Sequence, residues 1–407
     1  MNEKKLLIIG LVWPEPTSSA AGTRMIQLVD LFLRKGYAIT FASAASKSDF
    51  SYDFTHTIVN EQQIKLNDAS FNSFLKQLSP DIVMFDRFMV EEQYGWRVQQ
   101  ECPDALRILD TEDLHFLRSA RQQSDKKQNQ VDLFSDTAKR EIAAILRCDL
   151  SLIISEVEMD MLQETFKLDP SLLYYLPFLE NKITTEISQN WIPYEERADF
   201  MFIGNFLHEP NWNTVQVLKT KIWPTLRKKL PGVNLNIYGA YPSQKVLQLE
   251  NKSEKFFIRG RANHAQETIA AHRILLAPIQ FGAGVKGKFI DAMQVGTPSV
   301  TTSIGAEAMK GELKWNGFIE DDLTFFIDKA VELYQDKSAW LEAQQNGIEI
   351  INKRYSFSHF ADDFINTIKE IDLTKHRQQN FMGQILNHHT TQSTKYMSLW
   401  IEEKNKK

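Results

Sequence analysis

Two charged residues, Lys288 and Asp291, lie three positions apart in a segment that is otherwise glycine-rich and apolar. This spacing places them side by side near the start of a helix whose apolar face holds Phe289, Ala292 and Met293. A helix N-terminus attracts anions, because its free backbone N–H groups and its dipole point at them. A cation and a carboxylate at such an end suit a ligand with a phosphate end and a diol end, as in a nucleotide-sugar. The alternative is a structural i,i+3 ion pair on an ordinary helix.

Two expected strands flank this helix. Ile274–Pro278 is an apolar run typical of a buried parallel strand, and Ser299–Thr302 follows the helix as the next strand. The loop before the helix carries Gly282 and Gly284, where the backbone can approach a ligand closely. We therefore expect a βαβ unit whose ligand-binding residues are Gly282, Gly284, Lys288, Asp291 and, in the tight turn after the second strand, Gly305, Ala306 and Glu307.

The sequence FGAGVKGKFIDAM, followed by GTPSVTTSIGAE, resembles the donor-binding signature of retaining glycosyltransferases of family 4 (glycosyl transferases group 1), which have the GT-B fold. The resemblance implies that Asp291 holds the nucleotide ribose. In that family a second acid precedes the residue that corresponds to Asp291, with seven residues between the two acids. This chain has Ala283 at the position of that second acid. It resembles instead a branch in which a Gly-Ala-Gly loop and a following Lys occupy the region.

The resemblance further implies retaining glycosyl transfer from a nucleotide-sugar, with no cofactor and no required metal ion. The acceptor would be a saccharide or a lipid-linked molecule in the synthesis of a cell-envelope polysaccharide or glycolipid. Lys288 is then a catalytic candidate, because it would stabilise the departing diphosphate. Two alternatives stay open: a nucleotide-sugar epimerase on the same fold, and a catalytically silent nucleotide-sugar-binding subunit, which Ala283 suggests.

Two loops that follow expected strands supply further donor-side candidates. The strand Leu6–Val12, a loop of small residues and a helix from Thr23 to Arg34 form a Rossmann-like opening. The resemblance places the loop over the donor phosphates, so Gly22 and Thr23 are candidates. Asn205 and His208 follow a strand that ends at Ile203 and are candidates for the same reason. An ordinary turn is the alternative for both loops.

Asp110 and His115 are the catalytic candidates on the acceptor side. They follow the expected strand Leu106–Leu109, and open α/β sheets bind ligands at the carboxyl ends of their strands. Asp110 is expected to orient an acceptor hydroxyl, and His115 to act as a base or a hydrogen-bonding group. The alternative for this acidic stretch is the capped start of a helix. Its spacing matches no strong metal-ligand motif.

The length of 407 residues exceeds what one core usually supports, and strands alternate with helices along most of the chain. We therefore predict an α/β fold with two Rossmann-like, doubly wound domains that face each other across a cleft. The predicted parts are an acceptor-binding domain (1–185), a linker (186–198), a nucleotide-sugar-binding domain (199–355) and C-terminal helices (356–407) that pack back on the first domain.

Charge and hydropathy limit the partners and the compartment. A net charge of −5 gives no argument for nucleic acid as a partner. No apolar run approaches the ~20 residues of a membrane span, so we expect a soluble, cytoplasmic protein. In the tail, Tyr396 and Trp400 are expected to dock on the first domain. The alternative is a peripheral contact with the inner face of the membrane, because several lysines flank these aromatics: Lys395, Lys404, Lys406 and Lys407.

Overall fold

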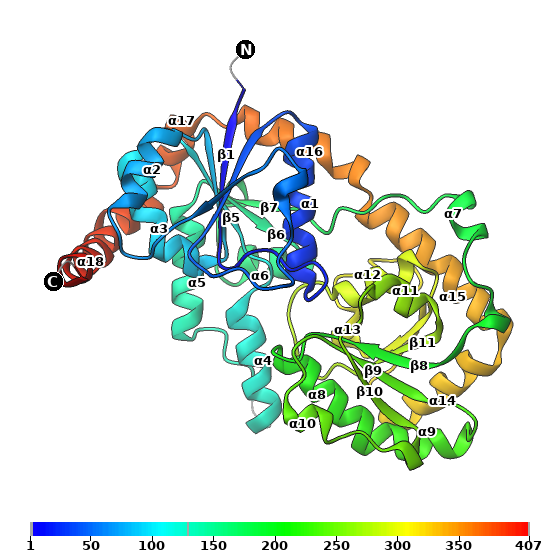
Figure 1. Cartoon of the computed structure of the whole chain (residues 1–407). Helices are drawn as coiled ribbons and strands as arrows, with labels where there is room; N and C mark the ends of the chain where they lie inside the picture. The colour runs from blue at the N-terminus through cyan, green and yellow to red at the C-terminus, as the bar shows by residue number, and fades with distance from the viewer. Residues whose placement is uncertain (1–2, 128–129, 406–407) are drawn as a thin grey trace.

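The first sheet consists of seven parallel strands in the order β3-β2-β1-β4-β5-β6-β7 (Figure 1). The computed structural model describes residues 3–127 and 130–405, without the side chains of 390–392. The strands are β1 Lys5–Gly10, β2 Ala38–Ser43, β3 Asn60–Gln63, β4 Ile82–Asp86, β5 Leu106–Asp110, β6 Leu150–Ile153 and β7 Leu173–Tyr175. The central strands β4, β5 and β6 are buried along their whole length because helices cover both faces of a parallel sheet.

Alternate residues of β1 enter two separate cores, as the period of two in a strand requires. Leu7 and Ile9 pack under one layer of helices, and Leu6 and Ile8 under the other. The first layer contains α2 Ser70–Leu78, α3 Phe88–Glu101, α5 Asp136–Arg147 and α6 Glu156–Glu164; the second contains α1 Ala20–Arg34 and α16 Phe357–Glu370. A further helix, α4 His115–Lys127, extends from the carboxyl edge of the sheet towards the second domain (Figure 1).

Helix α1 begins three residues earlier than expected. The Ser19 side chain accepts a hydrogen bond from the Gly22 N–H at 3.1 Å and so caps the helix at Ala20. Gly22 and Thr23 therefore lie in the first turn of α1, and the loop before it is shorter than the sequence suggested.

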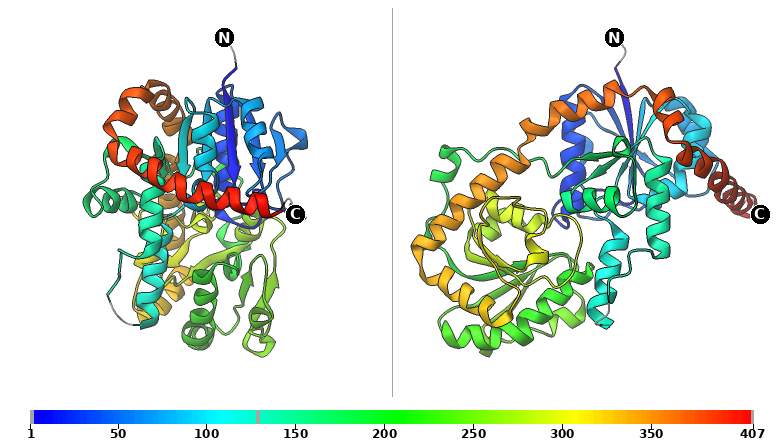
Figure 2. Two further views of the ribbon diagram at one scale, coloured as in Figure 1. Left: turned by 90° about the vertical axis from the view of Figure 1, so that its left-hand side faces the viewer. Right: turned by 180° about the vertical axis from the view of Figure 1, so that it is seen from behind.

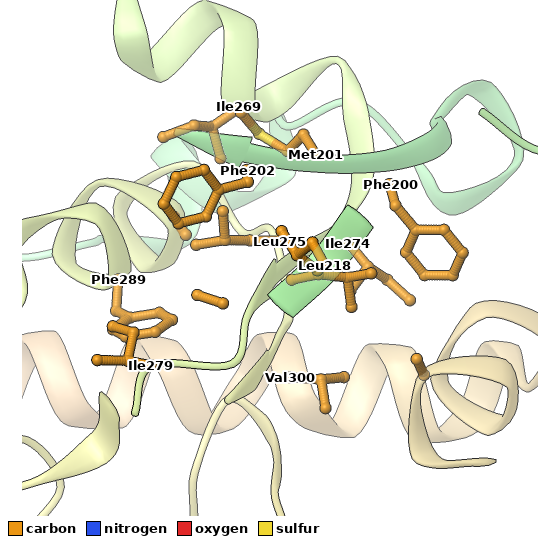
Figure 3. Close-up of a cluster of buried hydrophobic side chains, with 14 of the residues drawn as sticks. Phe200, Met201, Phe202, Leu218, Ile269, Ile274, Leu275, Ile279, Phe289 and Val300 are labelled. Carbon is orange, nitrogen blue, oxygen red and sulfur yellow. The ribbon is translucent and has the colours of Figure 1, made fainter. Parts of the chain in front are cut away.

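The second sheet has six parallel strands in the order β10-β9-β8-β11-β12-β13. They are β8 Ala198–Ile203, β9 Leu235–Tyr238, β10 Phe256–Gly260, β11 His272–Ala277, β12 Ser299–Thr301 and β13 Gly317–Ile319. Figure 3 shows the apolar side chains that join the sheet to its helices, with Phe202 of β8, Leu275 of β11 and Phe289 of α12 in one cluster.

The helices of the second domain include two short segments that are separated near Pro224. They are α8 Glu209–Val217, α9 Trp223–Lys229, α10 Gln244–Leu247, α11 Ala265–Ala270, α12 Gly287–Gln294, α13 Ser303–Ala306, α14 Leu323–Gln335 and α15 Lys337–Ile350. A π-helical turn before Pro224 separates α8 from α9, as the missing N–H of proline favours. Helix α8 begins at Glu209, so Asn211 and Asn213 lie inside the helix and do not cap it.

Two segments of the chain cross between the domains side by side. The outgoing segment leads into the short helix α7 Thr185–Gln189, and the returning one leads into α16. The Glu180 N–H donates to the Tyr355 carbonyl at 2.6 Å, and the Phe357 N–H donates to the Glu180 carbonyl at 2.8 Å. Helix α16 then buries Phe364 and Ile365 in a core of the first domain.

The chain ends with α17 Leu373–Gln379 and α18 Phe381–Asn405, which runs across the outside of the first domain (Figure 2). The expectation that Tyr396 and Trp400 dock on this domain is wrong, because their side chains are 65% and 60% exposed. Ser398 and Glu402 of α18 instead accept hydrogen bonds from Arg97 at 3.2 Å each. Lys406 and Lys407 lie outside the described residues. The predicted architecture of two Rossmann-like domains and a helical tail is confirmed. Within the described chain, no helix combines the length and the apolar character that crossing a bilayer requires.

Candidate functional site

The N-termini of α1 and α12 meet where the carboxyl ends of the two sheets face each other. Gly287, the first residue of α12, packs so closely on α1 that an added Cβ would lie 2.7 Å from the Cβ of Ala20. Both helix ends present free N–H groups and the positive pole of a helix dipole. Their junction is therefore suited to an anion such as a diphosphate.

Lys288 and Asp291 are half-buried residues of α12 beside this junction. Lys288 Nζ donates to Asn211 Oδ1 at 3.0 Å and lies 5.3 Å from the centre of the Phe202 ring. Asp291 Oδ1 accepts a hydrogen bond from Gln266 Nε2 at 3.3 Å. Lys288 and Asp291 do not approach within the 4.0 Å of an ion pair, so the i,i+3 ion-pair alternative is wrong. Each charge has a neutral hydrogen-bonding partner instead.

The surroundings shift the pKa of both groups towards neutrality. Burial lowers the pKa of Lys288 to about 8, and the nearby charge of Lys286 contributes to the decrease while Asp291 opposes it. Burial raises the pKa of Asp291 to about 6, against the effects of Gln266 and Lys288. Two ionisable groups with perturbed pKa values beside paired helix termini are typical of a binding or catalytic site.

The Gly-Ala-Gly loop before α12 is attached to the first domain. Gly284 has a φ of +62°, and an added Cβ would lie 2.9 Å from the Cβ of Asp113, so both its conformation and its contact favour glycine. Its N–H donates to Glu158 Oε1 at 2.9 Å, and the same oxygen accepts from the Leu114 N–H at 3.1 Å. Ala283 packs against the core of the first domain. At the position of the missing acid there is thus a methyl group in an apolar contact.

Glu158, which holds this loop, is itself buried. Burial raises the pKa of the Glu158 carboxyl to about 8, and the neighbouring Asp113 contributes to the increase. Its Oε2 has no hydrogen-bond partner among the described residues. The side chain of Ser155 accepts from the Glu158 N–H at 3.4 Å and caps α6, while the Glu158 carboxylate bridges the two domains.

A second interdomain contact involves Arg121 of α4. Its guanidinium forms a two-pronged ion pair with Glu307, with N–O distances of 2.6 and 2.8 Å, and donates to the Gly282 carbonyl at 2.8 Å. Gly305 and Ala306 lie in α13, where the Gly305 N–H donates to Thr302 Oγ1 at 3.1 Å. The donor-side candidates on these loops are therefore close to the interface, and Glu307 is engaged by an arginine of the first domain.

Two cations of the site, Arg121 and Lys286, were not predicted from the sequence. Lys286 is buried, its Nζ donates to the Gly284 carbonyl at 2.8 Å, and burial lowers its pKa to about 8, against the effect of Glu307. The Lys-Gly-Lys spacing at the start of α12 could have revealed Lys286. No local pattern in α4 indicates Arg121, because its partners lie more than a hundred residues away in sequence.

A cluster of charged residues and histidines joins α4 to the N-terminus of α8. His208 keeps an exposed edge, but desolvation between the two domains lowers its pKa to about 4, and Arg118 acts in the same direction. Burial alone would raise the pKa of Asp113, but Arg118 and His115 lower it to about 2. His115 Nδ1 lies 3.4 Å from Glu141 Oε1. The structure thus brings His115 and His208 to the same part of the interface.

The remaining candidates make local or internal contacts. Asp110 is completely buried, and its Oδ1 binds Arg24 through Nε at 3.1 Å and through a terminal nitrogen at 3.0 Å. Thr23 Oγ1 donates to the Pro16 carbonyl at 3.3 Å. Asn205 Oδ1 accepts from the Leu207 N–H at 2.8 Å and stabilises its own turn. Gly22 packs on the backbone of Glu15, where an added Cβ would lie 2.4 Å from the carbonyl oxygen.

Residues 197–336 match a family model described as Glycosyl transferases group 1. This segment contains β8 to α14 and includes Lys288 and Asp291. A comparison with curated protein sequences finds no match.

Solved structures with the same architecture share little sequence with this chain. Sucrose-phosphate synthase from Thermosynechococcus elongatus has a TM-score of 0.68 at 13% identity, over 90% of this chain and 99% of its own. HepE from Anabaena, in complex with UDP, has a TM-score of 0.65 at 12% identity, over 90% and 100%. TarM from S. aureus, in complex with Fondaparinux, alpha-GlcNAc-glycerol and UDP, has a TM-score of 0.58 at 15% identity, over 73% of this chain but only 57% of TarM. The chain thus has the GT-B fold, and its residues 197–336 are similar to the glycosyl transferases group 1.

Proposed function

We propose that the protein transfers a sugar from a nucleotide-diphosphate sugar to an acceptor hydroxyl with retention of configuration. The observation that carries this proposal is the arrangement of Lys288 and Asp291 on α12. The two groups lie beside paired helix N-termini, and each has a neutral partner that a ligand can replace or supplement. HepE and TarM, which share the fold, have been crystallised with UDP.

In this proposal the donor diphosphate binds at the junction of α1 and α12, next to Lys288. The Asp291 carboxylate accepts hydrogen bonds from the ribose hydroxyls. It can do so because a carboxylate accepts several hydrogen bonds and Asp291 already accepts one, from Gln266. Gly282 and Gly284 shape the loop that approaches the sugar. The charge of the diphosphate increases as the glycosidic bond breaks, so Lys288 and the backbone N–H groups stabilise the transition state more than the bound donor.

The acceptor attacks on the face from which the diphosphate leaves, and a donor phosphate oxygen takes the acceptor proton. This scheme requires no resident metal ion or cofactor, and it tolerates Ala283 where relatives have an acid. His115 contributes from the first domain as a hydrogen-bonding group that orients the acceptor. Asp110 acts through Arg24, which donates to the Leu176 and Pro177 carbonyls at 2.8 and 3.0 Å and so fixes α1. The acceptor is a saccharide or lipid-linked molecule of the cell envelope.

The test is incubation of the purified protein with a panel of nucleotide-sugars, with and without acceptors, followed by mass spectrometry. A glycosyltransferase releases nucleoside diphosphate and forms a product whose rate of appearance depends on the acceptor. An epimerase converts the nucleotide-sugar without an acceptor, and a binding subunit does neither, so either result contradicts the proposal. NMR of the anomeric proton in the product tests retention separately.

A further inference from the structure

Helix α18 carries large apolar side chains on its solvent-exposed side. We define its apolar face as Phe381, Met382, Ile385, Tyr396, Leu399 and Trp400, which are all 37% or more exposed. Their positions repeat at intervals of three, four and eleven residues, so they lie on one side of a helix of 3.6 residues per turn. Figure 2 shows that α18 runs along the outside of the molecule.

The opposite side of α18, which packs on the first domain, is polar. Ser398 Oγ accepts from Arg97 at 3.2 Å and donates to Asn67 Oδ1 at 2.8 Å, and the Asn387 side chain donates to the Arg147 carbonyl at 3.4 Å. An ordinary surface helix buries its apolar side and exposes its polar side. The orientation of α18 leaves two groups of apolar side chains exposed, Phe381–Ile385 and Tyr396–Trp400, with His388 and His389 between them. Exposed apolar groups of this kind are typical of an interaction site.

We propose that the apolar face of α18 docks on the surface of an anionic lipid bilayer. The local charge supports this occupant. Lys395 and Lys404 flank the aromatic residues, and Lys406 and Lys407 follow in the sequence. Of the two acids at this end, Glu402 is paired with Arg97, whereas the chain as a whole has a net charge of −5. In the sequence from 395 to 407, four lysines thus outnumber the two acids Glu402 and Glu403, and this excess of positive charge favours contact with lipid phosphates.

The shape and composition of the face also suit a bilayer. The face is one helix wide and convex, and its C-terminal end projects beyond the first domain (Figure 1). A stable protein–protein contact usually buries about 800 Å² per partner with complementary shape, which a single convex helix suits less well than a bilayer does. A helix of this length lies readily in the interfacial plane of a membrane, where tyrosine and tryptophan are favoured. Lys404 Nζ lies 5.2 Å from the centre of the Trp400 ring, so a cation accompanies the aromatic group that would enter the interface.

Docking through α18 would bring the acceptor-side domain to the membrane. A cavity of about 610 Å³ lies next to α18 and is lined by Met89, Trp96 and Thr394, among others. If the proposed function holds, this placement selects a lipid-linked acceptor over a free saccharide. Membrane binding itself does not depend on that function and can be measured without a donor.

The test is co-sedimentation with vesicles of phosphatidylcholine mixed with phosphatidylglycerol, and with vesicles of phosphatidylcholine alone. We expect the full chain to bind the anionic vesicles, with an affinity that falls as salt is added. Replacing Tyr396→Ser and Trp400→Ser together should reduce binding by about ten-fold or more, because each ring loses its contact with the interface. The matched control is Phe325→Ser on α14 of the second domain, an equally exposed apolar residue that should leave binding unchanged.

Three results would overturn the proposal: no binding of the full chain to either vesicle, equal binding of the double variant, or a dimer in light scattering that the double variant dissociates. The last result would assign the face to a second copy. If the double variant melts early, Trp400→Ser alone provides the test. Transfer to a water-soluble acceptor without vesicles should be the same in the double variant and the wild type. A failure of membrane docking is thereby distinguished from a failure of the proposed function.

Discussion

Two charged groups in each domain have different kinds of hydrogen-bonding partner. In the first domain, Glu91 and Asp110 are enclosed in the protein, and an arginine, Arg147 or Arg24, binds each carboxylate directly. In the second domain, Lys288 and Asp291 have neutral partners. A charged side chain that already forms an ion pair within the protein has little tendency to bind a ligand. A charge held only by an amide is available to one.

A comparison of two aspartates shows the same difference in their pKa values. Burial tends to raise the pKa of both. For Asp149, hydrogen bonds and charges from Arg377 and Arg107 outweigh burial and lower the pKa. For Asp291, burial prevails and the pKa rises to about 6. Asp149 therefore stabilises the fold in its ionised form, whereas Asp291 is ionised near neutral pH at a cost that a ligand can offset.

The largest expected effect tests the structural side of this comparison. Asp110→Ala should lower the free energy of unfolding by about 3–5 kcal/mol, because Arg24 remains buried without its carboxylate. Denaturant unfolding followed by circular dichroism measures the change. Replacing both partners with apolar residues, in Arg24→Met with Asp110→Leu, should restore much of the loss. An unchanged unfolding midpoint in Asp110→Ala would contradict a structural role for the ion pair.

Lys288→Ala tests the ligand-binding side and should hardly affect unfolding. Its turnover should fall a hundred- to a thousand-fold, because the loss of one group that stabilises developing charge costs about 2.7–4 kcal/mol. Lys288→Arg should recover part of the activity, since a planar guanidinium does not reproduce a point charge. Steady-state kinetics with a saturating donor measures both variants. Lys314→Ala, which removes an exposed lysine paired with Glu342, is the control. A Lys288→Ala protein with the turnover of the wild type would contradict the site assignment.

Asp291→Asn should weaken the binding of nucleoside diphosphate by ten-fold or more. The reason is the loss of a charge-assisted hydrogen bond to the ribose, which contributes about 1.5–3 kcal/mol. Isothermal titration calorimetry measures the affinity, and a melting curve checks that the variant is folded. Equal affinities of the folded variant and the wild type would show that the ribose is held elsewhere.

Much of the fold follows from local sequence patterns. The apolar runs around Leu6, Ile82, Phe200 and Ile274 predict buried parallel strands, and the structure contains β1, β4, β8 and β11 there. Strand β3 lies at Asn60–Gln63, a polar stretch without an apolar run. Its residues are polar because β3 is an edge strand, and edge strands lack the continuous apolar pattern. Strand β13 has only three residues, Gly317–Ile319, which are too few to show a strand period.

The candidate site was only partly predictable. The spacing of Lys288 and Asp291 indicated their place on one helix, because this relation is local. Their partners Asn211 and Gln266 come from other elements, and no periodicity reports such contacts. The interdomain contacts of Arg121 and Glu158 were also missed, since they depend on how closely the domains approach each other.

The smallest expected effect is a bell-shaped dependence of kcat/KM on pH, which reports the ionisation of the free protein. The rate constant should fall about ten-fold per pH unit below about pH 6, as Asp291 takes up a proton, and again above about pH 8, as Lys288 loses one. The signs follow from the two shifts. The pKa of Asp291 is raised by folding, so its contribution to stability is present at low pH and is lost as the pH rises through 6. The pKa of Lys288 is lowered, so its contribution is present at high pH and is lost as the pH falls through 8.

At pH 7 both groups are therefore in the charged form that folding disfavours and that a diphosphate and a ribose favour. Two variants separate the limbs of the profile. Asp291→Asn should abolish the acidic limb, because an amide does not titrate. Lys288→Arg should move the alkaline limb beyond the measurable range, because a guanidinium stays protonated. If both limbs persist in both variants, other groups control the reaction. The contrast between the two domains would then describe their stability and not their function.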